Sequence, residues 1–476
     1  MCKLQKVGIA LSVVVASCFS SMLNAENLEV VNNKKSDYSI ILQNDALNTP
    51  KFAAKELQAY IKKVTGAELK ITDAPRADGK NIFVGPSKYT EKLGVSLENV
   101  PAEGFRIKTV GKSIILAGQD TPGNPLDLHW RNGPQPGTLF AVYDFIEKYL
   151  GVRWYMPSEL GEYAPKKATL IVPGTDIKQA PDFVSRNLQV GTDKDTVLWA
   201  RRNKLGRSQI VSHSHNWYYI IPCYPSPEGW SKWQTKRYPF KDHPEYYALV
   251  DGKRVMTHRG SGRIHNGQIC TSNKDVQRIA AEVAAEYLKE NPGQPMFSIS
   301  ANDGGGYCEC SNCTALDQGD MADRMMSFYN GVAENLEKLA PGKLLGGYCY
   351  GNYTQPPKNT QPHKNLHLWM VHNDNLFSFD EYGLKKWEDL ISAWGKLSKN
   401  MYYYTAYNGG GFWGFPVPTR QRLANLIKFT KQQGYKGHLM GGLGPKGTFG
   451  GLDSYIAIRM MVSVQPGSSV VLFSVV

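Results

Sequence analysis

Residues 183–462 alternate between segments typical of β-strands and segments typical of α-helices. Such alternation predicts parallel βαβ units, because a helix must carry the chain back to the start of the next strand. Eight strands in succession predict a (β/α)8 barrel of the TIM type. The expected helices lie at 275–290, 322–339, 385–397 and 419–433. The expected strands lie near Val184, Ile210, Gln268, Phe297, Leu344, Leu366, Met401 and His438.

Residues 26–175 show a different pattern, in which two amphipathic helices are interleaved with short strands. Apolar residues recur at helical spacing over 53–64 and 137–150, and a glycine follows each segment, as is common where helices end. Segments 104–110 and 113–117 are expected to pair as strands. The predicted fold class is therefore α/β, with a small α/β domain at 26–175 before the barrel.

The first 25 residues are typical of an export signal, with a positively charged start, an apolar run and a small residue, Ala25, at the expected cleavage point. A cut before Cys18 is the competing hypothesis, because residues 15–18 resemble a lipobox and cleavage there would leave a lipid anchor. We expect an exported protein, periplasmic or extracellular. No later segment is apolar enough to span a membrane.

The formal net charge is +13, and two of these charges lie in the expected leader. A basic exported protein meets anionic glycans more readily than neutral ones, although a cationic surface without a specific ligand has the same composition. The sequence has no clustered Lys/Arg helix and no known binding motif, which excludes nucleic acid as an expected partner. It gives no indication of the oligomeric state.

The stretch Phe297–Cys313, FSISANDGGGYCECSNC, combines a strand, a polar tip, a glycine loop and a cysteine cluster. Catalytic groups of a (β/α)8 barrel lie at the C-terminal ends of its strands, which is the expected position of Asp303. The glycines that follow leave this carboxylate open to a ligand. Asp303 is the first candidate catalytic residue, and the alternative is that it caps the loop through its own backbone.

Glycoside hydrolysis usually requires two carboxyl groups that flank the scissile bond, and Asp374, after the sixth expected strand, is the second candidate. His213 and His215 share one face of a strand and are expected to bind sugar hydroxyls, with a metal or a structural role as alternatives. The expected substrate-binding residues are Arg186, His213, His215, Trp217, Asn302, Tyr348, Tyr350, Trp369, His372, Tyr404, Tyr407 and Trp413.

Three cysteines follow the glycine loop at the spacing Cys308-x-Cys310-x-x-Cys313. With Cys270 as a fourth ligand, this spacing is tight enough for a structural zinc ion. A loop disulfide is the competing hypothesis, since disulfides persist in exported proteins. We expect a structural role in either case and no cofactor that catalysis requires.

Two groups of segments resemble known families. AAKELQAYIKKVTG, EGFRI, GTLFAVYDFIEKYLGVRWYMP and GEYAP are similar to the N-terminal domain of α-glucuronidases and family 20 hexosaminidases, which precedes a catalytic barrel. HPEYYALVDGKR, QICTSN and SISANDGGGYCECSNC resemble an uncharacterised bacterial family of glycosidase-like barrels, domain-of-unknown-function family 4838. The resemblance implies carbohydrate chemistry. The chain departs from both enzyme families, because Asn302-Asp303 is not the Asp-Glu pair of the hexosaminidases and no Glu stands at that strand end.

The end of the chain, 463–476, is expected to be an atypical tail. A helix at 452–461, with Leu452, Ile456 and Met460 on one face, is predicted to cover the gap between the eighth and the first strand. The run 468–476 is apolar and uncharged, as in aggregation-prone segments. We therefore predict a barrel that is truncated and left partly uncovered.

Together these features predict a secreted glycoside hydrolase that acts on a polysaccharide or oligosaccharide, with a uronic acid or an amino sugar as the expected unit. One alternative is a non-catalytic glycan-binding protein on the same scaffold. A metal-assisted reaction on a sugar is the other.

Overall fold

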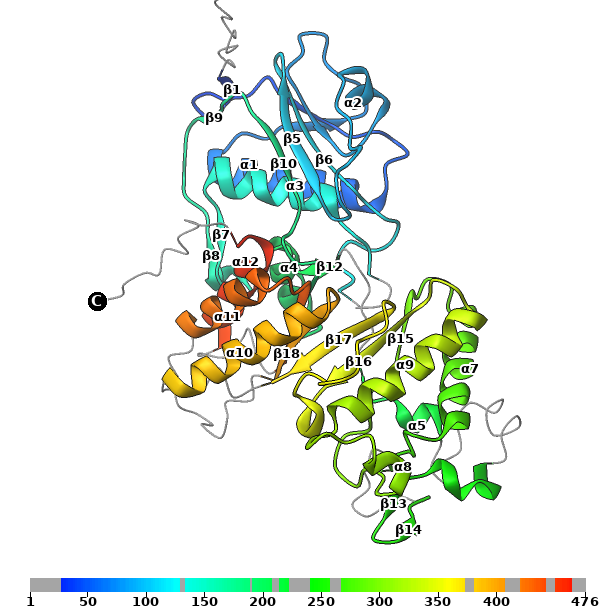
Figure 1. Ribbon diagram of the computed structural model, residues 1–476. Helices are drawn as coiled ribbons and strands as arrows, with labels where there is room; N and C mark the ends of the chain where they lie inside the picture. The colour runs from blue at the N-terminus through cyan, green and yellow to red at the C-terminus, as the bar shows by residue number, and fades with distance from the viewer. Residues whose placement is uncertain are drawn as a thin grey trace, which may run out of the picture.

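The computed structural model describes residues 27–128, 133–188, 191–207, 214–221, 240–256, 267–372, 381–406, 420–441 and 450–464. They form two main sheets, one of six strands near the N-terminus and one of seven strands in the remainder of the chain (Figure 1). The expected leader, the expected strand near Ile210 and the run 468–476 lie outside the described residues, so these three predictions stay predictions. Among the helices that are described, none has the length and apolar character needed to cross a bilayer.

The six-stranded sheet carries two helices, as the sequence predicts (Figure 1). Helix α1 (Asn48–Thr65) buries Leu57 and Ile61, and α3 (Gly137–Phe145) packs against both α1 and the sheet. The expected pairing of 104–110 with 113–117 is confirmed by antiparallel β5 and β6. The strands in spatial order are β10 (Asp176–Gln179), β5 (Phe105–Val110), β6 (Ser113–Gly118), β4 (Asn81–Val84), β2 (Ser39–Ile41) and β3 (Lys70–Thr72). Smaller elements are β1 (Leu28–Val31), α2 (Lys88–Lys92), β7 (Arg153–Trp154), β8 (Glu162–Tyr163) and β9 (Leu170–Val172).

The seven-stranded sheet is curled and has six parallel strands, of which β11 pairs with β19 just as the first and last strands of a barrel do. Six of the eight expected strands are thereby confirmed. In spatial order the strands are β12 (Gly206–Arg207), β11 (Ser185–Leu188), β19 (Gly437–Gly441), β18 (Met401–Ala406), β17 (Leu366–Val371), β16 (Leu344–Cys349) and β15 (Met296–Ser298). The described residues thus form a half-barrel, whereas the prediction was a closed barrel of eight strands.

The expected strand at Gln268 is wrong. Its neighbour Ile269 makes only an isolated antiparallel bridge with Tyr247. The place beside β15 is taken instead by His215, which makes a parallel bridge with Ser300. Because that edge is occupied, the backbone around Gln268 bonds to the preceding loop and does not join the sheet.

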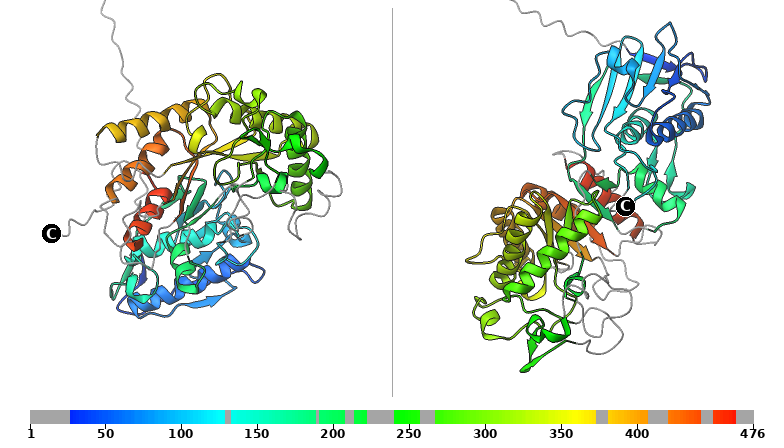
Figure 2. Two further views of the ribbon diagram at one scale, coloured as in Figure 1. Left: turned by 90° about the horizontal axis from the view of Figure 1, so that it is seen from below. Right: turned by 90° about the vertical axis from the view of Figure 1, so that its right-hand side faces the viewer.

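Side chains of the curled sheet alternate between two faces, as period-two strand geometry requires. Leu368, Met370, Met401 and Tyr403 belong to the main core, on the side of the helices, which line the outside of the sheet in Figure 2. The concave side has its own buried cluster, in which the register places neighbouring strands together: Met296, Tyr348, Trp369, Tyr402 and Leu439. The helices are α4 (Lys194–Arg202), α5 (Trp217–Ile220), α7 (Lys274–Glu290), α8 (Ser311–Thr314), α9 (Ala322–Leu339), α10 (Glu381–Leu397), α11 (Arg420–Gln432) and α12 (Gly450–Val462).

Helix α12 packs against α11 and β11, next to the pairing of the first and last strands. Ile456 and Met460 are buried as predicted, but Leu452 is 40% exposed, because it lies on the outer side of the first turn. The carbonyls of Met461 and Val462 accept hydrogen bonds from the amides of Phe183 and Asp182, so the end of α12 is tied to the entry of β11.

A partly buried acid, Asp120, lies beside the start of α3 and leads to a pH prediction. Oδ1 of Asp120 accepts a hydrogen bond of 2.9 Å from the amide of Thr138, and burial of the carboxyl group raises the pKa of Asp120 to about 7. Because the folded pKa lies above the unfolded value of 3.8, the folded protein holds a proton that the unfolded chain releases. We expect the free energy of unfolding to fall as the pH rises from about 4 to about 8, by at most about 4 kcal/mol. Urea unfolding of the wild type and of Asp120→Asn at both pH values measures this, and an equal pH dependence in the two proteins contradicts the prediction.

Candidate functional site

Polar side chains gather at the carboxyl ends of the parallel strands β15 to β18. Asp303 follows β15, Tyr350 follows β16, and Tyr404 lies near the end of β18. His215 joins them through its bridge to Ser300. In barrels of this kind the carboxyl ends of the strands are the edge that carries active sites.

Asp303 is the exposed carboxylate of this cluster, with 56% of its side chain accessible. Its Oδ1 lies 3.8 Å from Nε2 of His215 and 3.4 Å from the hydroxyl of Tyr350. Nδ1 of His215 lies 2.6 Å from the carbonyl oxygen of Ala301. Because a carbonyl oxygen only accepts, Nδ1 must carry a proton, which turns Nε2 toward Asp303. The neutral imidazole therefore presents the lone pair of Nε2 to Asp303, from 3.8 Å away, and can accept a proton from this carboxyl group.

Three tyrosines surround the Asp303–His215 pair. The ring centroids of Tyr348 and Tyr350 lie 5.2 Å and 6.0 Å from that of His215, both edge-on. Burial, and then the negative charge of Asp303, raise the pKa of Tyr350 and of Tyr404 above the usual value. Both phenols consequently stay protonated near neutral pH and present hydroxyl donors at the mouth of the half-barrel.

The sequence correctly places aromatic residues on these strands but assigns too many to the substrate. Trp369 is completely buried and stacks on Tyr402 with ring centroids 4.8 Å apart, so it fills the concave core. His372 follows β17, where its amide bonds to the carbonyl of Tyr404 and its ring lies against Trp387.

Besides Trp369, three more of the expected substrate-binding residues are structural, which corrects the prediction. The side chain of Arg186 is fully buried and its guanidinium bonds to Glu103 and to the carbonyls of Phe183 and Lys204. Trp217 is buried against Phe328 and donates to the carbonyl of Ile299. Asn302 is 1% exposed and bonds to Tyr218 and Gly267. A polar or aromatic residue near a strand end can thus spend its hydrogen-bonding groups on the backbone and have none left for a ligand.

Four further predicted residues lie outside the described residues: Asp374, His213, Tyr407 and Trp413.

The four cysteines come together as the sequence suggests. The sulfur atoms of Cys270, Cys308, Cys310 and Cys313 all lie within 4.8 Å of one another, and none is in a disulfide. Sequence reasoning missed two neighbours, Ser272 and Arg254, which bond to these sulfurs. The sequence holds a signal for both neighbours. Ser272 stands two residues after Cys270, and Arg254 ends HPEYYALVDGKR, one of the segments that carry the family resemblance.

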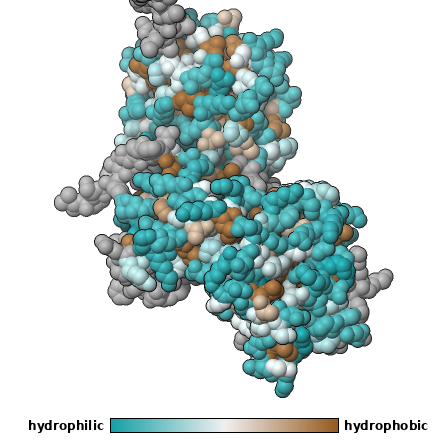
Figure 3. Space-filling view, in the orientation of Figure 1, coloured by the Kyte–Doolittle hydropathy of each residue, from teal (hydrophilic) through white to brown (hydrophobic). Residues whose placement is uncertain are grey.

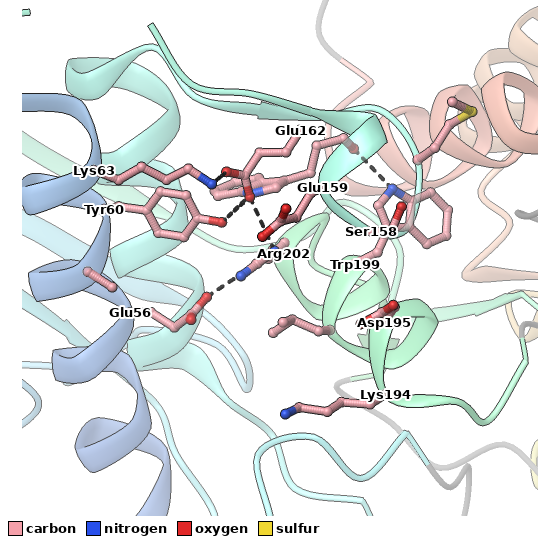
Figure 4. A pocket seen from close by; sticks show the side chains of 14 residues that line it. Glu56, Tyr60, Lys63, Ser158, Glu159, Glu162, Lys194, Asp195, Trp199 and Arg202 are labelled. Carbon is pink, nitrogen blue, oxygen red and sulfur yellow. Dashed lines mark hydrogen bonds and ion pairs between the residues drawn. The ribbon is translucent and has the colours of Figure 1, made fainter. Parts of the chain in front are cut away.

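A cavity of about 330 Å³ lies away from this cluster, between α1 and α4 (Figure 4). Arg202 reaches across it to Glu56 at 3.2 Å and to Glu162 at 3.5 Å. Glu162 also accepts from Tyr60 and Lys63. These charged side chains pair with one another across the cavity. Their ion pairs therefore connect α1 to α4. On the face in Figure 3, apolar residues are scattered over a mostly hydrophilic surface.

The solved structures that resemble this chain include glycoside hydrolases at 10–13% identity. A family GH115 4-O-methyl-α-glucuronidase with specificity for decorated arabinogalactans matches at 13% identity and a TM-score of 0.43, over 92% of this chain and 57% of its own. The N-acetyl-β-hexosaminidase of Streptomyces plicatus matches at 10% identity and a TM-score of 0.45, over 94% of this chain and 89% of its own. A family 89 glycoside hydrolase of Clostridium perfringens, solved with GlcNAc-α-1,4-galactose, matches at 12% identity and a TM-score of 0.44, over 89% of this chain and 49% of its own. This chain thus spans about half the length of two of these proteins.

No curated protein matches the chain. A family model does match, over residues 156–471, which include the whole curled sheet, Asp303 and the four cysteines. The family resemblance predicted from the sequence is confirmed by this match: the chain belongs to the family described as Domain of unknown function (DUF4838).

Proposed function

We propose that this protein hydrolyses glycosidic bonds at the carboxyl edge of the curled sheet. The observation that carries the proposal is Asp303, an exposed carboxylate held between the imidazole of His215 and the hydroxyl of Tyr350. A carboxyl group with these neighbours can give a proton to a departing glycosidic oxygen. Tyr350 and Tyr404, which are partly exposed, supply the aromatic surface and the hydroxyl donors that hold a sugar ring, whereas Tyr348 is buried in the concave-side cluster beneath them.

Asp303 serves in this proposal as the general acid. The second carboxyl group that hydrolysis needs is Asp374, three positions after the last residue of β17 in the sequence. His215 lies beside Asp303, with its Nε2 3.8 Å from Oδ1, where the imidazole can accept a proton from the carboxyl group. The net positive charge of the chain favours an anionic glycan, so a uronic acid is the preferred unit and an amino sugar is the next. The leader-like residues 1–25 support export to the compartment in which such glycans occur.

One observation favours the alternative, a glycan-binding protein without catalysis. Among the described residues, Asp303 is the one carboxylate of the cluster, and the rest of it is aromatic or imidazole. A sugar can be bound by such a surface without being cleaved.

Screening the purified full chain against 4-methylumbelliferyl uronides and hexosaminides, with glycan binding measured in parallel, separates the two functions. We expect release of the fluorophore from at least one glycoside, and we expect the released sugar to inhibit. Binding of glycans with no hydrolysis of any oligosaccharide or aryl glycoside would support the binding protein and reject the hydrolase.

The contribution of Tyr350 to catalysis at this site can be tested by mutation. Its hydroxyl donates to Oδ1 of Asp303 over 3.4 Å. We expect Tyr350→Phe to lower kcat/KM about tenfold, as the loss of one hydrogen bond worth about 1.4 kcal/mol requires. The matched control is Tyr382→Phe on α10, because Tyr382 is 82% exposed. Equal activity of the two variants on the best substrate would remove Tyr350 from the site.

A further inference from the structure

We propose that Cys270, Cys308, Cys310 and Cys313 bind one zinc ion as a tetrahedral tetrathiolate site, and that this ion holds the loop that carries Asp303. Zinc–sulfur bonds of about 2.3 Å in tetrahedral geometry place the sulfurs about 3.8 Å apart. Sγ of Cys270 lies 3.7 Å from Sγ of Cys310 and 3.8 Å from Sγ of Cys313. The spacing is therefore that of four ligands around a single ion.

The competing hypotheses require other distances. A disulfide joins two sulfurs at about 2.05 Å, and the cysteines here stand in one group of four, not in two bonded pairs. An iron–sulfur cluster uses four cysteines that ligate different iron atoms, which spreads the sulfurs farther apart than around one ion. Four sulfurs within 4.8 Å of one another fit a single small cation that prefers thiolate.

The surroundings of the sulfurs suit the two negative charges of such a site. The amide of Leu249 donates to Sγ of Cys308 over 3.3 Å, and the guanidinium of Arg254 lies 3.6 Å from the same sulfur. The hydroxyl of Ser272 lies 3.1 Å from Sγ of Cys313. Donors of this kind orient metal-bound thiolates and offset their charge. Ala248, Leu249 and Val250 cover the cluster with apolar surface, which limits the access of water.

The site joins two segments that α7 and β15 separate in the sequence. Cys270 precedes α7, whereas Cys308, Cys310 and Cys313 lie on the loop that starts at Asp303 and ends in α8. Three glycines, 304–306, follow Asp303 directly, so the backbone of this loop is poorly constrained by itself. A metal ion bound at Cys308 and Cys310 fixes the far end of the glycine loop and thereby the position of Asp303.

Elemental analysis of the purified full chain tests the proposal. We expect one zinc ion per chain, and we expect alkylation without reduction to label all four cysteines once the protein is unfolded in a chelator. Cobalt(II) in place of zinc should give the absorption bands of a tetrahedral thiolate site. Cys313→Ser should lose the metal. Cys349→Ser should retain it, because Cys349 is a free cysteine buried in β16 and separate from the cluster.

The proposal is overturned if the wild-type chain holds no zinc and its cysteines resist alkylation as disulfides, or if it holds iron. Full zinc content in Cys313→Ser would overturn it as well, and the wild-type measurements stand even if that variant does not fold. Hydrogen exchange adds a test that does not depend on activity. Removal of zinc should speed exchange at 303–313 and leave β16 protected, and unchanged exchange in the loop would reject the link to Asp303.

Discussion

Asp303→Asn should abolish most of the hydrolytic activity, lowering kcat/KM by about 10²- to 10⁴-fold, which is the range expected for a general acid. The amide keeps the size of the carboxyl group and can still accept from Tyr350, so the fold and the binding of sugar should be retained. Only the transferable proton is lost. The measurement is kcat/KM on the glycoside that the screen identifies, with the melting temperature as a check of folding.

Leaving-group chemistry sharpens this prediction. A dinitrophenyl glycoside needs no proton on its departing oxygen, so Asp303→Asn should hydrolyse it nearly as fast as the wild type does. Asp45→Asn, at an exposed aspartate in the N-terminal part of the chain, is the matched control and should change neither substrate's rate. A uniform loss on both substrates would reassign Asp303 from acid to another role, and full activity on both would remove it from catalysis.

The second large effect is expected from the ion pair between Glu103 and Arg186. Both side chains are completely buried, and their closest oxygen and nitrogen lie 2.7 Å apart. Glu103 also accepts from the amide of Arg207, so it links the loop before β5 to β11 and β12. Removing one partner leaves a buried charge without compensation. We expect Glu103→Gln and Arg186→Met each to lower the free energy of unfolding by about 3–5 kcal/mol.

Urea unfolding of the two single variants and of the double variant tests this. The double variant should lose less than the sum of the single losses, because neither Glu103 nor Arg186 is then left as a buried charge without its partner, although the buried charge of Arg201 also loses Glu103. Glu68→Gln, which breaks the exposed pair with Lys62, should change the stability by less than about 0.5 kcal/mol. A loss of that small size in Arg186→Met would show that the pair contributes little, and strictly additive losses would show that the two charges are not coupled.

The sequence by itself determined the elements that depend on local periodicity and turn residues. Helices α1, α7, α9 and α11 lie within a few residues of the expected positions, because apolar residues at helical spacing can form one buried face only as a helix. The hairpin of β5 and β6 follows for the same reason, with strand patterns on either side of Gly111. Cysteine spacing alone brought three of the four sulfurs together, since a loop that short keeps its ligands close.

Only the tertiary structure decided which polar residues face open space. Binding sites often contain residues of the types found at Arg186, Trp217 and Asn302. Here their hydrogen bonds go instead to backbone carbonyls, backbone amides and a buried carboxylate. Asp303 is close to His215 because the segment of His215 takes the edge beside β15, where Gln268 was expected, and that pairing is between residues far apart in sequence. Local patterns specify which face of a strand is apolar. They do not specify which distant segment occupies a sheet edge, since that depends on the free energy of the whole packed arrangement.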